Sequence, residues 1–585
     1  MKKLMLFMLL VVALGLITAC GRGNDAQQGE GEPTENQTQD APVATEPPAT
    51  PAEEQVEPDT SEGINWEEHI TFTWFMNATP ANDFYTSFND NPVVHYLQHR
   101  FNVTFEFEQA PVGTESDHLA LMMGAGRHTD VINLAPYVGS IPQLYYDGII
   151  VDIAQWLDYM PYLRSALESR PDWARGAFDD SGRILTLPDF NYGTVYPWSG
   201  LMYRHDILET MTEGNVQFPS GNDVPTTIAD WEYMLPLFLE FFQEAGFADF
   251  APLILPAGPM GVFHFGELMN SFGAYYMFYV RDGVVYAGML EPAMFEYVST
   301  MRDWFERGWI HQDFASRTTD MFFMPNPPLV FGGAAGAWFG MMMHMGDRMS
   351  MPEFGMYFDV RAMPSPMGEG ITHRDMLRRR EGPYGAVRAN AVYAGNPDIG
   401  RFLAIMDIFY SEHGGRLRTL GLTAEQIPPG TVMEAMDMMD GAYWFDANGN
   451  VVLNPLLDDA GGPISRGAVN GIRLPGIQAI VYPNAARSDE MMLAHTQWGA
   501  HDDATEVHPL PSVLTPTLEE AAILAANEAR FTDFIDQTMA TFIMGTAPLN
   551  EETWEDFLAQ LRDFGFEENR EIWQAAYDRY LGRVG

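Results

Sequence analysis

The first twenty residues constrain the rest of the chain most strongly. Lys2 and Lys3 form a short basic head, an apolar run follows from Leu4 to Leu16, and small residues then lead to Cys20. The apolar run has the length of a secretory signal and is too short to span a bilayer comfortably as a helix. Cys20 is the only cysteine, so no disulfide within one molecule competes for it.

The end of this stretch, Leu16-Ile17-Thr18-Ala19-Cys20, resembles the lipobox of bacterial lipoproteins. The resemblance implies that residues 1–19 are a signal peptide, that cleavage precedes Cys20, and that Cys20 carries lipid on its sulfur and on the new amino terminus. An ordinary secretory signal or an uncleaved anchor is the alternative. Residues 20–63 are rich in Glu, Gln, Thr, Pro and Ala, a composition that buries too little apolar surface to offset its ordering entropy. We expect the lipidated Cys20 to be followed by a disordered acidic tether.

The charge balance excludes several classes of function. The 585 residues hold 32 Lys and Arg against 80 Asp and Glu, a net charge of −48. Both lysines lie in the signal, so the remaining chain has 30 arginines and a charge of −50. No basic face is available to neutralise nucleic-acid phosphates or to adsorb to anionic lipid. The absence of lysine after the signal also excludes Schiff-base lysine chemistry and Walker-type phosphate loops.

The globular part starts near Ile64 and alternates strands with helices. Alternating or apolar short runs predict strands over 70–75, 103–107 and 130–134, and helical patterns predict helices over 92–100 and 118–124. This order favours parallel βαβ wiring. Further along, a turn at 179–183 predicts a strand over 184–187, and a helix is expected over 231–245 after the Pro-Thr-Thr entry at 225–227.

Several sequence segments, taken in order, resemble segments of one protein family. Gly182 to Pro188 (GRILTLP), Tyr203 to Leu208 (YRHDIL), Val284 to Asp313, and Phe358 to Gly368 (FDVRAMPSPMG) resemble segments of extracellular solute-binding lipoproteins of bacteria. The closing forty residues look like the final pair of helices of the large carbohydrate-type members. The resemblance spans roughly Ile64 to the end. Lysines typical of these phrases are replaced by Arg183 and His205.

The resemblance implies an α/β protein with the two-lobed, type II periplasmic-binding-protein-like fold, mixed sheets and an interlobe cleft with a hinge. The N-terminal lobe is expected to comprise residues 64–195 plus about 365–425. The C-terminal lobe is expected to comprise residues 196–364 plus about 426–585. The chain is expected to cross between the lobes near 196–201 and 361–385.

Catalytic and metal motifs are missing. The sequence has no Gly-x-Ser-x-Gly elbow, no His-Glu-x-x-His and no paired cysteine ligands. His95 and His99 are four residues apart on an expected helix, but no third metal ligand accompanies them, so two surface or half-buried histidines are preferred. Asp446 to Asn450 resembles the start of a calcium loop but lacks the distal Glu, because residue 457 is Leu, and a hairpin turn is preferred. We expect no metal and no cofactor.

Aromatic residues on expected loops are the candidates for ligand binding. Sugar rings stack on aromatic faces, while amides, carboxylates and arginines bind hydroxyls, which fits the general anatomy of ligand sites. The candidate ligand-binding residues are Asn77, Asp83, Tyr137, Trp198, Arg204, Trp338, Tyr384 and Trp498. Each could instead be a packing residue, since cores also use aromatics.

Together, the sequence predicts a non-enzymatic, membrane-tethered extracellular protein that is monomeric. By resemblance, it is a substrate-binding subunit of an ABC importer that binds a carbohydrate, expected to be an oligosaccharide, and delivers it to transmembrane permease subunits. The membrane contact would be the lipid on Cys20, and no nucleic acid is expected as a partner. Open alternatives are a secreted polysaccharide-degrading lipoprotein, a binding protein that signals to a membrane receptor, and a peptide-binding version of the fold.

Overall fold

The computed structural model describes residues 64–583 except 78–79, 81, 112, 192–198, 256–267, 317–325, 353–354, 369–389, 448, 458–462, 472, 479–488, 500–506 and 512. Cys20, Trp198 and Tyr384 lie outside the described residues, as do half of the expected crossing at 196–201 and most of the one at 361–385. Within the described part, no helix is long and apolar enough to cross a membrane.

The first sheet has the strand order β11-β3-β1-β2 and is mixed. β1 (Ile70–Met76) runs parallel to β2 (Val103–Gln109) and to β3 (Val131–Asn133), and β11 (Asn390–Val392) is antiparallel to β3. The first three strands confirm the sequence prediction. The expected strand over 184–187 is wrong, because only Leu187 forms an isolated bridge, to Asn390.

The second sheet has the order β10-β5-β9-β6. Its strands are β5 (Ser199–Arg204), β6 (Ala251–Leu253), β9 (Ala335–Met341) and β10 (Val360–Ala362). β6 is parallel to β9, whereas β5 is antiparallel to both β9 and β10. Since side chains alternate across a strand, Tyr203 and Ala337 belong to one buried cluster and Met202 and Trp338 to another.

The remaining described strands form three smaller sheets. β15 (Val507–Pro509), β7 (Phe278–Arg281) and β8 (Val284–Ala287) form one of them, with a turn at Asp282-Gly283 between β7 and β8. β12 (Tyr443–Phe445) and β13 (Val451–Leu453) form the hairpin expected around Asp446 to Asn450. β4 (Asp189–Asn191) and β14 (Gly476–Gln478) form a parallel pair.

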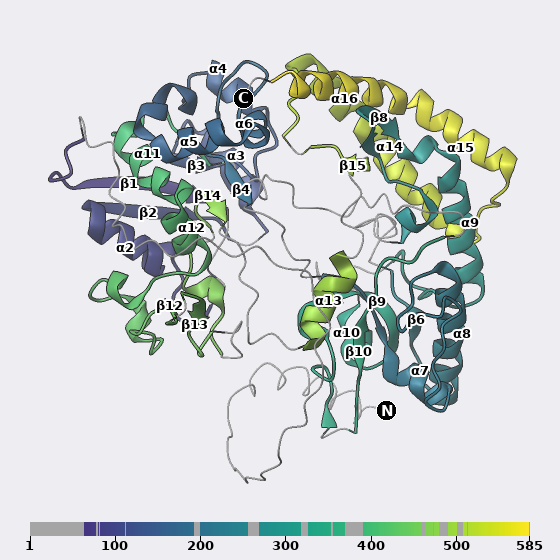
Figure 1. Cartoon of the computed structure of the whole chain (residues 1–585). Helices are drawn as coiled ribbons and strands as arrows, with labels where there is room; N and C mark the ends of the chain where they lie inside the picture. The colour runs from purple at the N-terminus through teal and green to yellow at the C-terminus, as the bar shows by residue number, and fades with distance from the viewer. Residues whose placement is uncertain are drawn as a thin grey trace, which may run out of the picture. The chain divides into compact units, whose positions relative to one another are not determined.

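The helices cover these sheets (Figure 1). They are α2 (Pro92–Phe101), α3 (Glu115–Gly124), α4 (Ile141–Tyr146), α5 (Pro161–Ser169), α6 (Pro171–Ala177), α7 (His205–Met211), α8 (Ile228–Glu244), α9 (Pro292–Glu306), α10 (Pro327–Phe331), α11 (Ile399–Asp407), α12 (Glu412–Thr419), α13 (Asp489–Gly499), α14 (Leu518–Ile543), α15 (Glu551–Asp563) and α16 (Phe566–Leu581). Local chemistry sets their starts: α8 begins at a capping box of Thr227 and Asp230, in which each residue satisfies a free N–H of the other.

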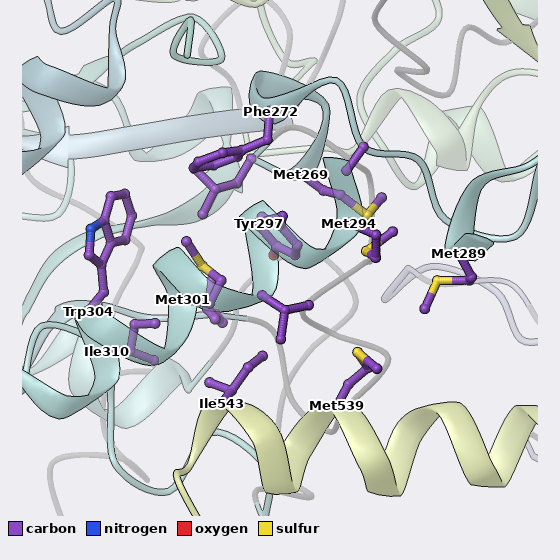
Figure 2. Packing of buried hydrophobic residues seen from close by; sticks show 14 of the residues in the cluster. Met269, Phe272, Met289, Met294, Tyr297, Met301, Trp304, Ile310, Met539 and Ile543 are labelled. Atoms are coloured by element: carbon purple, nitrogen blue, oxygen red, sulfur yellow. The ribbon is translucent and has the colours of Figure 1, made fainter. Parts of the chain in front are cut away.

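One large core is rich in methionine (Figure 2). On α9, Met294, Tyr297, Met301 and Trp304 follow helical spacing and are fully buried. Met539 of α14 is buried in the same cluster. Methionine has three flexible side-chain torsions and fills irregular gaps between such aromatic rings.

The other large core shows that one expected lobe boundary is wrong. Residues 433–477 were expected in the second lobe, but Met433, Leu457 and Leu474 pack in the same cluster as Phe72 and Leu97 of the first sheet and its helix. The pairing of β14 with β4 and a hydrogen bond from Arg418 Nε to the Leu474 carbonyl at 2.8 Å reinforce this attachment. The chain therefore leaves the first core after residue 477 rather than near residue 425. No local sequence pattern indicates that residues 433–477 pack against the first core, because the pairing of β14 with β4 joins residues almost three hundred positions apart.

Candidate ligand-binding site

The carboxyl ends of three parallel strands meet at one edge of the first sheet. Met76 pairs with Gln109, and Phe75 pairs with Ile132, so β1, β2 and β3 end together. Ligands of open α/β sheets bind outside this edge, where the loops after the strands converge. Asn77 follows β1 directly and is half-buried. It is therefore placed where the sequence analysis expected a binding residue.

Tyr137 lies in the loop that follows β3. The loop is closed by a hydrogen bond from the Tyr137 N–H to the Leu134 carbonyl, and α4 begins after the Ser140 cap. A Cβ on Gly139 would lie 2.3 Å from the Tyr137 hydroxyl, so only glycine lets the ring lie against this loop. The ring is half-buried, and burial raises the pKa of its hydroxyl. This arrangement leaves an amphipathic aromatic group at the strand edge, the kind that stacks on sugar rings.

A charged cluster that the sequence analysis did not single out lies beside the same edge. Glu108, one residue before the end of β2, accepts hydrogen bonds from Arg127 at 2.5 and 2.7 Å and pairs with His118 at 2.8 Å. The hydrogen bonds from Arg127 lower the pKa of Glu108. Arg127 remains 56% exposed, so its guanidinium can also donate to a ligand hydroxyl. Only the position of Glu108 near a strand end could have indicated this cluster from sequence.

Buried amides hold the strand edge rigid. The Asn390 Oδ1 accepts from the Trp74 indole at 3.2 Å and from the Asn133 amide at 3.1 Å. The Asn133 Oδ1 in turn accepts from the Ala135 N–H at 3.1 Å. Because buried polar groups in a satisfied network resist displacement, this network fixes the first residues of the loop that carries Tyr137.

At the second sheet, the predictions for two tryptophans fail. Trp338 is 1% exposed and Trp498 is 4% exposed, both in the cluster formed on one face of this sheet. The Trp498 indole donates to the Leu201 carbonyl at 2.8 Å, and its ring lies against Gly200. These rings are packing residues and present no face to a ligand. Gly200 on β5 makes room for the Trp498 ring, and Gly340 on β9 makes room for the Trp338 ring.

Arg204 is also a structural residue. Its guanidinium is 6% exposed, forms a bidentate pair with Asp206 at 2.6 and 2.8 Å, and donates to the Gly333 carbonyl at 3.2 Å. It also lies 4.1 Å from the ring centroid of Phe358. With these partners it ties β5 to the start of α7 and to the chain before β9, so the predicted role in ligand binding is wrong.

The remaining candidates are separated from the strand edge. Asp83 is exposed and lines a groove beside α2. His95 is half-buried and His99 is exposed, as the sequence analysis preferred. Among the described residues, no group of three or more His, Cys, Asp or Glu is placed to hold a metal ion.

The fold matches those of known solute-binding proteins. No protein-family model matches the chain, and a search of curated proteins gave no match. Among solved structures, it is similar to an HMO-binding, ABC-transporter-associated solute-binding protein from Bifidobacterium longum infantis, with a TM-score of 0.66 and 18% identity over 88% of this chain and 99% of that one. The S. pneumoniae substrate-binding protein FusA in complex with kestose gives a TM-score of 0.63 and 17% identity over 88% of this chain and 100% of that one. The alginate-binding protein AlgQ2 gives a TM-score of 0.60 and 18% identity over 87% of this chain and 98% of that one.

These likenesses extend over nearly the whole length of each relative, and they establish the fold. The chain is an α/β protein with the two-lobed fold of ABC-transporter solute-binding proteins. The type II fold class expected from the sequence is confirmed.

Proposed function

We propose that this protein is the extracellular substrate-binding subunit of an ABC importer for a carbohydrate. The observation that carries the proposal is the fold shared with proteins that bind HMO, kestose and alginate. The strand edge of the first sheet supports it, because Asn77, Tyr137 and the Glu108–Arg127 pair supply an amide, an aromatic ring and charged hydrogen-bonding groups. An aromatic surface with a few polar groups is how proteins recognise a polyhydroxylated ligand.

The mode of action follows from the same proposal. The ligand, an oligosaccharide, binds between the strand edges of the two lobes and is handed to the transmembrane permease subunits, so the protein itself performs no catalysis. Cys20 carries the lipid that holds it at the extracellular face of the membrane, and residues 20–63 form the tether. It acts as a monomer. Closure by a hinge between the lobes would exclude water from the bound sugar.

Ligand binding is tested by thermal shift and calorimetry on the full chain. The panel contains kestose, an alginate oligosaccharide, a milk oligosaccharide and a pentapeptide. A ligand that binds the folded state raises the melting temperature, by an amount set by its concentration relative to Kd. A rise with one of the sugars supports the proposal; a rise with the peptide alone, or with none of the four, refutes it.

Variants then test the strand edge. Tyr137→Ala and Asn77→Ala should each weaken the affinity for the sugar that binds by about tenfold, since an aromatic contact is worth about 0.5–1.5 kcal/mol. Leu121→Ala is the matched control, because Leu121 lies on α3 and is 75% exposed. Unchanged affinity in both edge variants would show that the sugar binds elsewhere. Palmitate labelling that disappears in Cys20→Ser tests the anchor.

A further inference from the structure

A groove runs along the outer edge of the first sheet. Its walls are the loop of residues 82–90, helix α2 and the segment Gly430–Val432, and its volume is about 870 Å³. This size lies within the range of small-molecule sites. β2 is the last strand of the described sheet, and its residue Thr104 forms part of the groove lining.

The groove begins beside the strand edge that holds Asn77 and Tyr137, because its loop 82–90 follows β1, and it extends away from that edge. Thr104 lines it and pairs with Thr71 at the amino ends of the strands. Thr86 lines its other end and accepts a hydrogen bond from Gln109 at the carboxyl end of β2. At about 3.3 Å per residue, the five steps from Thr104 to Gln109 span about 16 Å. The Thr104 end of the groove therefore lies about 16 Å from the strand edge proposed as the transport site.

Side-chain amides hold the walls in place. Asn89 donates to the Phe105 carbonyl at 2.8 Å and accepts from the Phe107 N–H at 3.2 Å, and Gln98 accepts from the Phe105 N–H at 2.8 Å. These bonds use the free backbone groups of β2 to attach the loop and the helix. The Tyr85 hydroxyl donates to the Ala468 carbonyl at 2.8 Å. This bond attaches the loop 82–90 to the chain segment around Ala468. The groove is thus preorganised, which reduces the entropy lost when a ligand binds.

Four polar side chains that line the groove have no hydrogen bond or ion pair within the described chain. They are Asp83, Asp90, His95 and His99. Phe84, which is 38% exposed, adds an aromatic face to the same groove. The described lining contains no Arg or Lys, so it offers no attraction for a phosphate or a carboxylate ligand. No metal-binding group of three or more ligands is formed there, as noted above.

From these observations we propose that the groove is a second saccharide-binding site, selective for neutral sugars. Carboxylates accept hydrogen bonds from pairs of sugar hydroxyls, imidazoles both donate and accept, and the Phe84 ring can stack on the C–H face of a pyranose. The length of the groove suits a short chain of sugar units rather than a single one. The site holds a glycan on the side of the lobe, independently of the ligand carried for transport.

Photoaffinity labelling of the full chain tests this site. Diazirine-bearing maltotriose, xylotriose and N-acetylchitotriose are the probes, and peptide mapping locates the label. We expect at least one probe to label residues 82–104. Phe84→Ala should reduce that labelling at least tenfold, and the near-isosteric Asp83→Asn and Asp90→Asn variants should also reduce it. Leu121→Ala and Asn77→Ala should leave it unchanged.

The outcomes separate this proposal from the transport site. Labelling only at the strand edge, or labelling of the groove that none of the three variants reduces, overturns the second site. Spermidine is the competitor that tests a cationic ligand instead: if it binds the groove while no sugar labels it, the proposal is also overturned. Phe84 is partly exposed, so Phe84→Ala should melt with the wild-type protein and the comparison stays valid.

Discussion

The close contact between Gly200 and Trp498 makes a sharp prediction about the buried cluster on one face of the second sheet. A Cβ on Gly200 would lie 2.4 Å from Cδ1, 2.5 Å from Cγ and 2.6 Å from Nε1 of the Trp498 ring. All three distances are far below van der Waals contact, and the neighbour is a rigid indole rather than the end of a flexible chain. Gly200→Ala must therefore displace Trp498 or the strand β5 itself.

The cost follows from two contributions. Forcing an extra methyl into a packed core costs about 1–3 kcal/mol. If the indole shifts, its 2.8 Å hydrogen bond to the Leu201 carbonyl is lost as well, and an unsatisfied buried group costs about 1–3 kcal/mol. We expect a total of about 3 kcal/mol. For a cooperative unit of about 200 residues, this corresponds to a fall in Tm of about 6–12 °C.

Calorimetry, with tryptophan fluorescence as a second probe, measures the effect. Gly124→Ala is the control, because a Cβ there meets no atom within 4 Å and the residue ends helix α3; this variant should melt at or slightly above the wild-type temperature. In a Trp498→Leu background the cost of Gly200→Ala should shrink, since contacting residues couple energetically. A Gly200→Ala protein that melts with the wild type, or an equal cost in both backgrounds, would refute the reasoning.

Two other predictions concern buried charges. Asp407 is 1% exposed and accepts from the Tyr162 and Leu163 N–H groups, and burial raises its pKa from 3.8 to about 7. The native state therefore binds more protons than the unfolded chain between these values, and this carboxyl's contribution to stability is full below about pH 4 and lost as the pH rises through about 7. Asp407→Asn should gain stability relative to the wild type between pH 5 and pH 8 in urea titrations; a constant difference would contradict this. Asp180 accepts from Arg579 at 2.8 Å and from Arg583 at 2.7 Å, and the Arg583 side chain is 2% exposed. Asp180→Asn should lower the free energy of unfolding by about 1–3 kcal/mol. No change in this free energy would show that backbone contacts alone hold the end of helix α16.

Local patterns were sufficient to predict many individual elements. The strands at 70, 103 and 131, the capped helix after Thr227 and the closing helices from Glu551 were all marked by periodicity or capping residues next to one another in the chain. The assignment of residues 433–477 was not, because it depends on the pairing of β14 with β4. Such a pairing is decided by packing between distant segments, which leaves no trace in a short window of sequence.

The binding residues were harder to predict than the fold. Asn77 and Tyr137 follow strands, and the fold brings both to one strand edge; their role in ligand binding stays a prediction. Trp338 and Trp498 were misassigned because a large ring beside glycine can be either exposed on a loop or accommodated in a core. Arg204 was misassigned because its ion pair with Asp206 and its hydrogen bond to the Gly333 carbonyl depend on the fold. Arg127 was missed because its role depends on its pairing with Glu108 of a different element.

The side-chain amides of Asn89 and Gln98 affect whether a strand of another molecule can pair with β2. A bare edge strand offers a row of N–H and C=O groups to which a strand of another molecule can add, and this is a common route to aggregation. In this protein, Asn89 and Gln98 already occupy the backbone groups of Phe105 and Phe107. A strand from a second copy of the protein would therefore find these β2 groups already paired, which disfavours strand addition along this edge.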